Sequence, residues 1–574
     1  MYANEIYVTL DDPLNKEEVL DHFNKTFDFA KSQMGSAQEI ALRLTPLKDV
    51  YYTHDTTFDF NPKGHRETNY VLLGIAFLIL FIAGINFTNL TTSLIPLRLK
   101  TINTHRVLGC SIYKLRAISL IESIVICLIS YILALFIVND LSYTPIANWV
   151  DADIRLSQYK ALILLTALIA ILTGCLAGLY PAIRSTSYAP ALVLKGSFGL
   201  SPKGKKVRVA LIGFQYTVSI ALIIVTLFMG LQNHFMTSSE QLGFNKDQVA
   251  IVNLTPEIYA KHKPQYIQKL KDYPGIEDVA FSVYELSKED DMIDLEYARH
   301  EDKDVFFKVF YASENFLSVM DIQVEEGRDF TREDLNKAQS DYIINPAAER
   351  DFHLHPGDRF NDRTVLGVSK DFRFNSCRIA SSPFVFALNN DIPNPKLVSY
   401  IRFNSKTNLQ EAVAHVRETL KEIDPTFPFE ISFYNTILNN LYQKEQTLGK
   451  LISLFGIMAI LISIVGVFGL VLFETQYRRK EIGIRKINGA TTGQILLMFN
   501  KTYIRIVSVC FIISIPIAWM GTQQWLENFA YKTPLHLWVF IVAYLIILSV
   551  TIGTVTFRNW QAANENPVNS VKSE

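Results

Sequence analysis

Seven long apolar runs alternate with polar segments along this chain of 574 residues. A helix needs about 20 such residues to cross a bilayer. The pattern therefore predicts seven helices in a lipid bilayer, at residues 70–96, 117–138, 161–183, 209–232, 451–473, 504–525 and 537–557. Glu122 and Arg505 fall near the ends of their helices, and we expect them to reach toward the lipid headgroups.

The charge of the connecting segments indicates how the helices are oriented. Lys and Arg concentrate in residues 97–116, 184–208 and 474–502, while the loops between these segments are short and poor in both. Basic loops of membrane proteins stay in the cytoplasm. We therefore expect a multi-pass protein of the bacterial inner membrane with a cytoplasmic C-terminus and residues 233–450 in the periplasm.

Residues 233–450 alternate between strand and helix patterns. The expected strands lie at 248–254, 279–283, 398–403 and 429–433, and the expected helices at 256–271 and 408–423. Two strand–helix–strand pieces around a strand-rich insert predict an α/β domain. A last helix, residues 434–450, is expected to run straight into the membrane.

The chain also repeats itself. Residues 98–110 align with 478–490 at an offset of 380, and residues 180–195 align with 557–572 at an offset of 377. Residues 1–50 show a strand (5–10), a helix (16–30) and a strand (39–44) that match residues 398–433. We interpret the chain as two tandem copies of one unit, each with three spans that follow a far-side domain.

This repeat predicts five segments. They are the end of a first periplasmic domain (1–68), a first three-span unit (69–198), a linker with an extra opening span (199–232), a periplasmic α/β domain (233–450), and a second three-span unit with a tail (451–574). The first copy lacks the opening span and most of its domain. We therefore expect that the sequence is incomplete at its N-terminus, or that its start is mis-assigned.

Composition and motifs argue against several other classes. A formal net charge of −1 gives no general reason to expect a nucleic-acid partner, and five scattered cysteines form no metal or disulfide pattern. We find no GxxxxGK[ST] phosphate loop, GxSxG elbow or HExxH motif, so we expect neither an enzyme nor a cofactor. His353 and His355, with Asp351 and Asp358 nearby, are more typical of a solvated loop than of a metal site.

The basic stretch 478–490 has features beyond its charge. Five of its thirteen residues are basic, Glu481 and Arg485 are spaced for an i,i+4 ion pair on a helix, and Gly489 suits a left-handed helix end. A solvated loop that only sets topology explains the charge equally well. The presence of a second copy at residues 98–110 favours a shared function.

Several motifs resemble those of the FtsX-like/MacB-type ABC transporter permeases. They are Arg479–Ala490, Phe214–Ile220, Leu242–Val249, Glu326–Phe330, Gly367–Phe372 and Asn566–Val568. In that family the basic loop is a coupling helix that docks on a separate ATP-binding subunit. The resemblance implies this role for Arg478, Arg479, Lys480, Glu481, Ile482, Gly483, Arg485, Lys486 and Gly489, and for Arg98, Lys100, Arg106 and Gly109 in the first loop.

The first loop departs from the pattern, since Thr101 and Asn103 stand where the second has Glu481 and Gly483. The resemblance implies a permease subunit that exports or expels a periplasmic substrate such as a peptide, lipoprotein or drug, with a possible periplasmic adaptor. Asn86, Thr88, Asn89 and Gln215 are more typical of interhelical hydrogen bonds than of a transport path. The alternatives are a mechanotransmitter that regulates a periplasmic enzyme or sensor, and a non-functional remnant.

Overall fold

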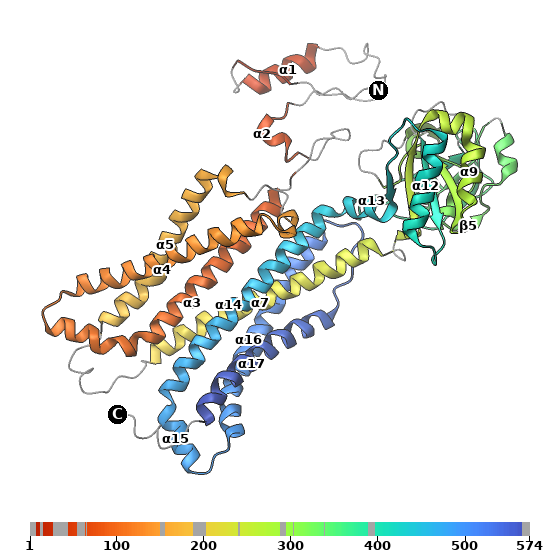
Figure 1. Ribbon diagram of the computed structural model, residues 1–574. Coiled ribbons are helices and arrows are strands. Elements are labelled where there is room, and N and C mark those ends of the chain that lie inside the picture. Colours follow the sequence, from red (N-terminus) through yellow and green to blue (C-terminus); the bar gives the residue numbers. More distant parts are fainter. Residues whose placement is uncertain are drawn as a thin grey trace. The chain divides into compact units, whose positions relative to one another are not determined.

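A computed structural model gives the fold of residues 7–11, 15–26, 44–53, 64, 66–149, 155–187, 202–238, 242–287, 294–301, 303–337, 339–388 and 397–564. The chain forms two compact parts, residues 1–75 and 76–574, and each is described by itself. Within the described residues, seven helices are long and apolar enough to cross a membrane, as predicted. The predicted class, a helical membrane protein with an α/β domain, is confirmed (Figure 1).

The seven long helices extend beyond their apolar runs. They are α3 (Arg66–Val107), α4 (Ile112–Leu141), α5 (Lys160–Thr186), α7 (Pro202–Thr237), α14 (Gln443–Tyr477), α16 (Thr492–Leu526) and α17 (Leu537–Asn564). Between α4 and α5 lie the 3-10 turns η3 (Pro145–Trp149) and η4 (Leu156–Gln158). We call α3, α4 and α5 the first repeat. We call α7, α14, α16 and α17 the second repeat, in which α7 packs against the other three helices.

The part formed by residues 1–75 confirms the repeat only in its helix. α1 (Lys16–Thr26) matches the predicted helix, and α2 (Leu47–Val50) carries Asp49, which pairs with Arg66 at the start of α3. Residues 7–10 form no strand, which corrects the prediction for 5–10. A strand needs a hydrogen-bonded neighbour, and no described residue of this part supplies one. The strand expected at 39–44 lies outside the described residues except for Leu44.

The domain between α7 and α14, residues 242–442, is built on one mixed sheet, and we call it the extramembrane domain. Its strands are β1 (Val249–Leu254), β2 (Ile276–Ser282), β3 (Asp294–His300), β4 (Lys303–Ala312), β5 (Val324–Gly327), β6 (Tyr342–Ile344), β7 (Arg359–Phe360), β8 (Arg363–Ser369), β9 (Phe384–Leu388), β10 (Leu397–Phe403) and β11 (Ile431–Phe433). Their order is β11-β1-β10-β2-β4-β9-β6-β8-β5, with β3 paired to β4 and β7 to β8.

The two predicted strand–helix–strand pieces are interleaved in this sheet. β10 lies between β1 and β2 and runs antiparallel to both, and β11 flanks β1. The helical parts are the π-helical turn η5 (Ile258–His262) with α9 (Lys263–Lys271) in the first piece, and α12 (Leu409–Ile423) in the second. This is the split βαβ arrangement. The strands and helices predicted for both pieces are therefore confirmed.

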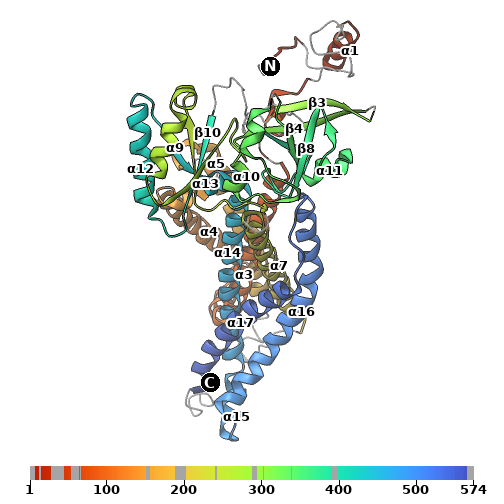
Figure 2. The same cartoon turned by 90° about the vertical axis from the view of Figure 1, so that its right-hand side faces the viewer.

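The interleaved strands bury side chains on both faces because successive residues point to opposite sides. Ala250 and Val252 of β1 contact the core that includes α9 and α12. Val249 and Ile251 enter a second core, which also holds Tyr434 of α13 (Tyr434–Leu441). We call residues 294–388, which are inserted between β2 and β10, the inserted lobe. Figure 2 shows β3, β8 and α11 in the inserted lobe and α9 and α12 beside the interleaved strands. The remaining short helices are α10 (Phe316–Met320), η6 (Arg332–Asn336) and α11 (Pro346–Phe352).

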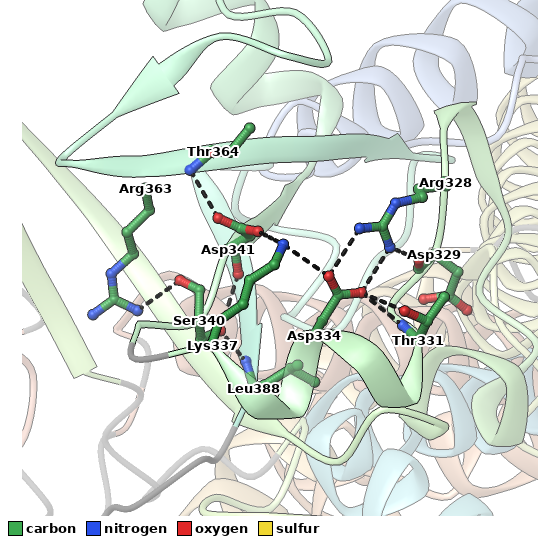
Figure 3. A network of polar contacts seen from close by, with 10 residues as sticks. All are labelled: Arg328, Asp329, Thr331, Asp334, Lys337, Ser340, Asp341, Arg363, Thr364 and Leu388. Carbon is green, nitrogen blue, oxygen red and sulfur yellow. Dashed lines mark hydrogen bonds and ion pairs between the residues drawn. The ribbon is translucent and has the colours of Figure 1, made fainter.

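A buried carboxylate organises the inserted lobe (Figure 3). Asp334 receives two hydrogen bonds from the Arg328 guanidinium, at 2.7 and 2.8 Å, and one from the Thr331 hydroxyl at 2.8 Å. Lys337 Nζ lies 2.9 Å from the same carboxylate. The guanidinium and these other donors hold the pKa of Asp334 well below its usual range. The motif 326–330 therefore begins at the end of β5, where Gly327 adopts φ +80° and the following Arg328 reaches the carboxylate.

We expect Asp334→Asn to destabilise this lobe by about 2 kcal/mol, because Arg328 and Lys337 lose a charged acceptor but remain half-exposed to water. Local opening of residues 324–344 should then speed up roughly 30-fold, measured by hydrogen exchange of the full chain. Because folding lowers the pKa of Asp334, the carboxylate stabilises the wild type fully above pH about 4, the pKa of an unfolded aspartate. Below that pH the difference in stability between wild type and variant should shrink. An unchanged exchange rate at pH 7 would contradict this role.

The helix that links the extramembrane domain to the membrane differs from the prediction. The helix expected at 434–450 is broken at Tyr442, where α13 ends and α14 begins, with φ −104° and ψ 13°. The break allows the fully buried Tyr442 ring to enter the domain core. There its hydroxyl accepts a hydrogen bond from Cys377 N at 3.3 Å. Packing of one aromatic side chain, rather than continuous helix propensity, decides the geometry of this connection.

Candidate functional site

The second basic loop, residues 478–490, contains the short helix that its sequence predicts. α15 (Arg479–Ile487) lies between α14 and α16, at the end of α14 far from the extramembrane domain (Figure 1). Arg485 Nη2 lies 2.7 Å from Glu481 Oε1, which confirms the expected i,i+4 pair. The other guanidinium nitrogen, Nη1, donates to Met498 Sδ on α16 at 2.7 Å. These contacts fix α15 against the start of the next helix.

The first basic loop, residues 98–110, ends in the same way. α3 continues without interruption to Val107, and Gly109 then adopts φ +89°, as Gly489 does with φ +86°. Cys110 N donates to the His105 carbonyl at 2.9 Å, and Ala490 N donates to that of Arg485 at the same distance. Both pairs close the left-handed helix end that glycine favours. The repeat is therefore preserved at atomic detail.

The following helix is capped equivalently in both loops. The Ser111 hydroxyl accepts from Lys114 N, and the Thr491 hydroxyl accepts from Gln494 N, each at 3.3 Å. Gln494 Oε1 also accepts from Thr491 N at 3.1 Å, which completes a capping box in the second loop only. A glycine turn followed by a capped helix fixes the angle between the two spans in each repeat.

Gly489→Ala should destabilise the second loop by about 1 kcal/mol, because an L side chain is strained at this left-handed φ. A Cβ at Gly489 would meet no atom within 4 Å, so the cost is conformational rather than steric. Gly521→Ala is the matched control, because Gly521 lies in α16 with equally open surroundings and should gain stability. Thermal unfolding of the full chain would measure both, and destabilisation by the control alone would contradict the argument.

Equivalent arginines, Arg98 and Arg478, begin the two loops but pair with different carboxylates. Arg98 forms two 2.8 Å hydrogen bonds with Glu122 on α4. Its counterpart, Arg478, lies between α14 and α15, 2.9 Å from Glu474 of α14, and Tyr503 OH donates to the same carboxylate at 3.2 Å. Glu122 is therefore held by an interhelical ion pair, which replaces the expectation that it only reaches toward the headgroups. Each repeat neutralises this arginine, by a different route.

The structure sorts the predicted loop residues into inward and outward positions. Ile482 and Gly483 are buried against the helices, as is Asn103, the counterpart of Gly483. Arg106 donates to the Thr186 carbonyl at 3.3 Å, so it contacts the end of α5. The side chains of Arg479, Lys480 and Lys100 lie outside the described residues, and Lys486 is half-buried.

Two outward-facing apolar residues were missing from the predicted site. Ile484 and Ile487 of α15 expose 54% and 65% of their surface, and Val107, the counterpart of Ile487, exposes 68%. Exposed apolar residues beside basic ones, at the tip of a loop, are typical of a surface that binds another protein. The signal was present in the sequence, since Ile484 and Ile487 are three positions apart and share one helix face. The charge pattern alone does not indicate these two residues.

The two repeats contact each other at equivalent residues of α3 and α14. Asn86, the counterpart of Gly466, donates to the Ile462 carbonyl at 2.6 Å, and a Cβ at Gly466 would collide with the Asn86 amide. Further along, Leu90 packs against Gly469. Both helices therefore run in the same direction through a contact related by a pseudo-two-fold axis. The two basic loops consequently lie at the same end of the bundle.

Buried polar side chains in the helices form contacts between helices, as predicted for Asn86 and Thr88. The Thr88 hydroxyl donates to the Ala177 carbonyl at 2.9 Å. Ser219 of α7 and Ser463 of α14 share a 3.0 Å hydrogen bond. In the apolar region such bonds favour a defined packing of helices.

Of the histidine pair noted in the sequence, His355 contacts the expected neighbour Asp358 and also a glutamate that was not expected there. Asp358 accepts a hydrogen bond from the backbone of His355, and Glu349 Oε1 lies 3.6 Å from the His355 ring. Ligand atoms of Glu326, Glu349 and His355 lie within 4.8 Å of one another at the surface. This arrangement was not predicted, because Glu326 comes from β5.

Both groups of membrane helices match a known protein family. A family model described as "FtsX-like permease C-terminal" matches residues 73–190 and again residues 453–567. The FtsX-like permease domain therefore occurs twice in this chain. The two matches confirm the tandem repeat and the family predicted from the motifs, so the first and second repeats each carry one FtsX-like domain.

Curated relatives match over shorter stretches. The macrolide export ATP-binding/permease protein MacB of Aggregatibacter actinomycetemcomitans is 25% identical over 212 residues, which cover 35% of this chain and 32% of that protein. MacB of Neisseria gonorrhoeae is 25% identical over 223 residues, covering 36% of this chain and 34% of the relative. The permease chain thus spans about a third of the length of the relatives it matches.

Solved structures with similarity cover parts of this permease. They include the periplasmic region of MacB from Actinobacillus actinomycetemcomitans (14% identity, 35% of this chain, 94% of that chain, TM-score 0.26). A second is the extracellular domain of the ABC-type transporter YknZ from Gram-positive bacteria (15%, 32%, 99%, 0.24). A third is a domain of a permease protein from Porphyromonas gingivalis (15%, 33%, 92%, 0.23).

Proposed function

We propose that this FtsX-like permease is the membrane subunit of an ABC transporter and couples ATP hydrolysis by a separate cytoplasmic subunit to motion of its extramembrane domain. The observation that carries the proposal is the pair of equivalent basic loops at one end of the bundle. Both end in a left-handed glycine and a capped helix, and both present exposed apolar residues. Such a surface suits docking into a groove of a folded partner.

The pseudo-two-fold contact between α3 and α14 supports a stoichiometry for this complex. Because Asn86 meets the region of its own counterpart, Gly466, the repeats present their loops as two related surfaces. One permease chain would then bind two copies of the ATP-binding subunit. The capping box and the Glu481–Arg485 pair of the second loop favour it as the stronger docking surface.

The orientation follows from the charge of the loops. The basic loops and the C-terminus would lie in the cytoplasm and the extramembrane domain in the periplasm, in the inner membrane of the cell. The proposed boundaries remain 1–68, 69–198, 199–232, 233–450 and 451–574. The helices α7 and α14 would then connect the basic loops on one side of the membrane with the extramembrane domain on the other.

The cargo is proposed only as a class. Export or expulsion of a periplasmic peptide, lipoprotein or drug fits the family, and macrolide export is the activity named for the MacB relatives. A periplasmic adaptor is a further possible partner. The alternative is mechanotransmission to a periplasmic enzyme or sensor, which is favoured by polar span residues engaged in contacts between helices, such as Ser219 with Ser463.

The test is reconstitution of the full chain in nanodiscs with an ABC-type ATP-binding protein from the same cell. We expect the permease to bind that protein and to raise its ATPase rate. Binding with no change in rate, or no binding, would contradict the proposal. Capture of a periplasmic peptide, lipoprotein or drug by the same nanodiscs would favour transport, whereas capture of a cell-wall hydrolase or a kinase would favour mechanotransmission.

A further inference from the structure

Three side chains that are able to bind a metal ion lie together on the surface of the inserted lobe. They are Glu326 of β5, Glu349 of α11 and His355 of the loop that follows α11. Their ligand atoms lie within 4.8 Å of one another, and His355 Nδ1 lies 3.6 Å from Glu349 Oε1. Because the three residues come from separate elements, the fold of the lobe brings them together.

The turn after α11 places His355 beside Glu349. His353 ends the helix with φ +52°, and Leu354 N then donates to the Glu349 carbonyl at 3.2 Å. Leu354 is buried in the core of the lobe, and the next residue, His355, returns to the surface. The Asp358 carboxylate accepts from His355 N at 2.7 Å, which holds the backbone of His355 in place.

The edge strand β5 brings the second carboxylate to the same place. Glu326 pairs with Val368 of β8, and α11 packs against β8 as well. A Cβ at Gly367 of β8 would lie 2.7 Å from the Glu326 carbonyl oxygen, so glycine at this position permits the close approach of β5. The sheet therefore fixes the backbone that carries Glu326, as the helix fixes that of Glu349.

The two glutamates lack the basic partners that the central acid of this lobe has. Arg328 and Lys337 both lie against Asp334. Within the part of the chain that the structure describes, neither Glu326 nor Glu349 forms an ion pair with a lysine or an arginine. Two carboxylates held this close repel each other, and a bound cation relieves the repulsion.

We propose that Glu326, Glu349 and His355 bind a divalent transition-metal ion of the zinc class. Imidazole nitrogen and carboxylate oxygen are both zinc ligands, at about 2.0–2.2 Å from the ion. Two such ligands of a tetrahedral ion lie roughly 3.4 Å apart, close to the 3.6 Å between His355 Nδ1 and Glu349 Oε1. Calcium and magnesium fit less well, because they prefer about six or more oxygen ligands.

Three protein ligands leave the fourth position of the ion open to water or to a donor atom of another molecule. Glu326 and His355 are exposed, so the ion is accessible from solvent. The bound ion links β5 to α11 and stabilises the lobe against separation of these two elements. The site is distant in sequence from the basic loops and does not depend on their proposed role.

The experiment is a titration of the full chain in nanodiscs, with its purification tag removed, with Zn²⁺ against a zinc-binding indicator dye. We expect one ion per chain at this site, and His355→Asn, Glu326→Gln and Glu349→Gln should each weaken its binding at least tenfold. His353→Asn is the matched control, because asparagine tolerates the left-handed φ of this position; it should bind within twofold of wild type.

Two results of the titration would overturn the proposal. Absence of zinc binding by the wild type would mean that His355 only forms an ion pair with the glutamates. Binding that is equally strong in the three variants would mean that zinc binds elsewhere on the chain.

Hydrogen exchange provides a second measurement that does not depend on the dye. Zinc at 100 times its dissociation constant should slow the exchange of amides in β5 and α11 by up to about 100-fold in the wild type and in His353→Asn. It should have no such effect in His355→Asn. Equal protection in wild type and His355→Asn would overturn the proposal, and equal protection by Mg²⁺ would overturn the assignment to the zinc class.

Discussion

Replacement of both exposed isoleucines of α15, Ile484→Asp with Ile487→Asp, is expected to weaken binding of the ATP-binding subunit at least 100-fold. Their side chains are largely exposed in the permease and are available to fill a partner's apolar groove, and central apolar contacts of an interface each contribute on the order of 2 kcal/mol. A buried carboxylate would instead add a desolvation cost. Binding is measured with the full chain in nanodiscs by co-purification and by titration of ATPase stimulation.

The matched control for this change is Ile484→Val with Ile487→Val, which keeps an apolar surface of similar shape. It should bind within a few fold of wild type. Both variants should unfold at the wild-type temperature, because Ile482, which faces the helices, is left in place. Binding and stimulation at the wild-type level in the aspartate variant would show that α15 is not the docking helix.

The corresponding change in the first loop, Val107→Asp with Leu108→Asp, tests whether the loops are unequal. Both residues are highly exposed, but the loop lacks the Glu481–Arg485 pair, since Thr101 and His105 occupy those positions. We expect a smaller loss than in the second loop. Equal losses would show that the two surfaces contribute alike.

Periodicity made the membrane helices and the two interleaved strand–helix–strand pieces predictable. Apolar runs of the right length specify spans wherever lipid is the solvent. A strand such as β1 was predictable for a similar reason: Val249 to Val252 are apolar at every position, as expected of a strand that is buried on both faces. The left-handed conformation of Gly489 was predictable because glycine at a helix end favours it. Gly109 occupies the same position in the first copy of the repeat, 380 residues earlier.

Features that depend on contacts distant in sequence were not predictable. Glu122 appeared to be an isolated acid near a helix end, but its partner Arg98 comes from the preceding helix. Tyr442 fitted a continuous helix, but its ring packs in the domain core, and its contact with Cys377 comes from a distant part of the chain. Helix spacing indicates the outward direction of Ile484, whereas the charge pattern of the loop does not. The pattern of a single sequence does not show which residues that are distant along the chain contact each other.

The loop between α16 and α17 contacts both the extramembrane domain and α7. We therefore expect a substitution in this loop to have a large effect on coupling between the two. Tyr531 N donates to the Cys377 carbonyl of the domain at 3.1 Å, and Gln232 of α7 donates to the Tyr531 carbonyl at 3.0 Å. The Arg373 guanidinium lies 4.1 Å from the centre of the Tyr531 ring. Nearby, Arg378 pairs with Glu445 of α14 at 2.7 Å. One tyrosine thus contacts both the extramembrane domain and α7.

We expect Tyr531→Ala to preserve binding of the ATP-binding subunit but to uncouple it from the extramembrane domain. Loss of the ring removes the cation–π contact, apolar burial and the hydroxyl that accepts from Ser381 N at 3.1 Å, together about 3 kcal/mol. Opening of this junction should then be about 100-fold more frequent, measured by hydrogen exchange of residues 373–381. Nucleotide-dependent changes in the domain should be lost.

Tyr531→Phe separates this role from a general loss of stability. It keeps the ring over Arg373 and every backbone bond of the loop, and removes only the hydroxyl. It should therefore retain most of the domain response, with exchange raised less than tenfold. If Tyr531→Ala left the response of the extramembrane domain to ATP intact, force would have to pass through the chain connections of the domain to α7 and α14 and through the Arg378–Glu445 pair. The loop between α16 and α17 would then be only a support.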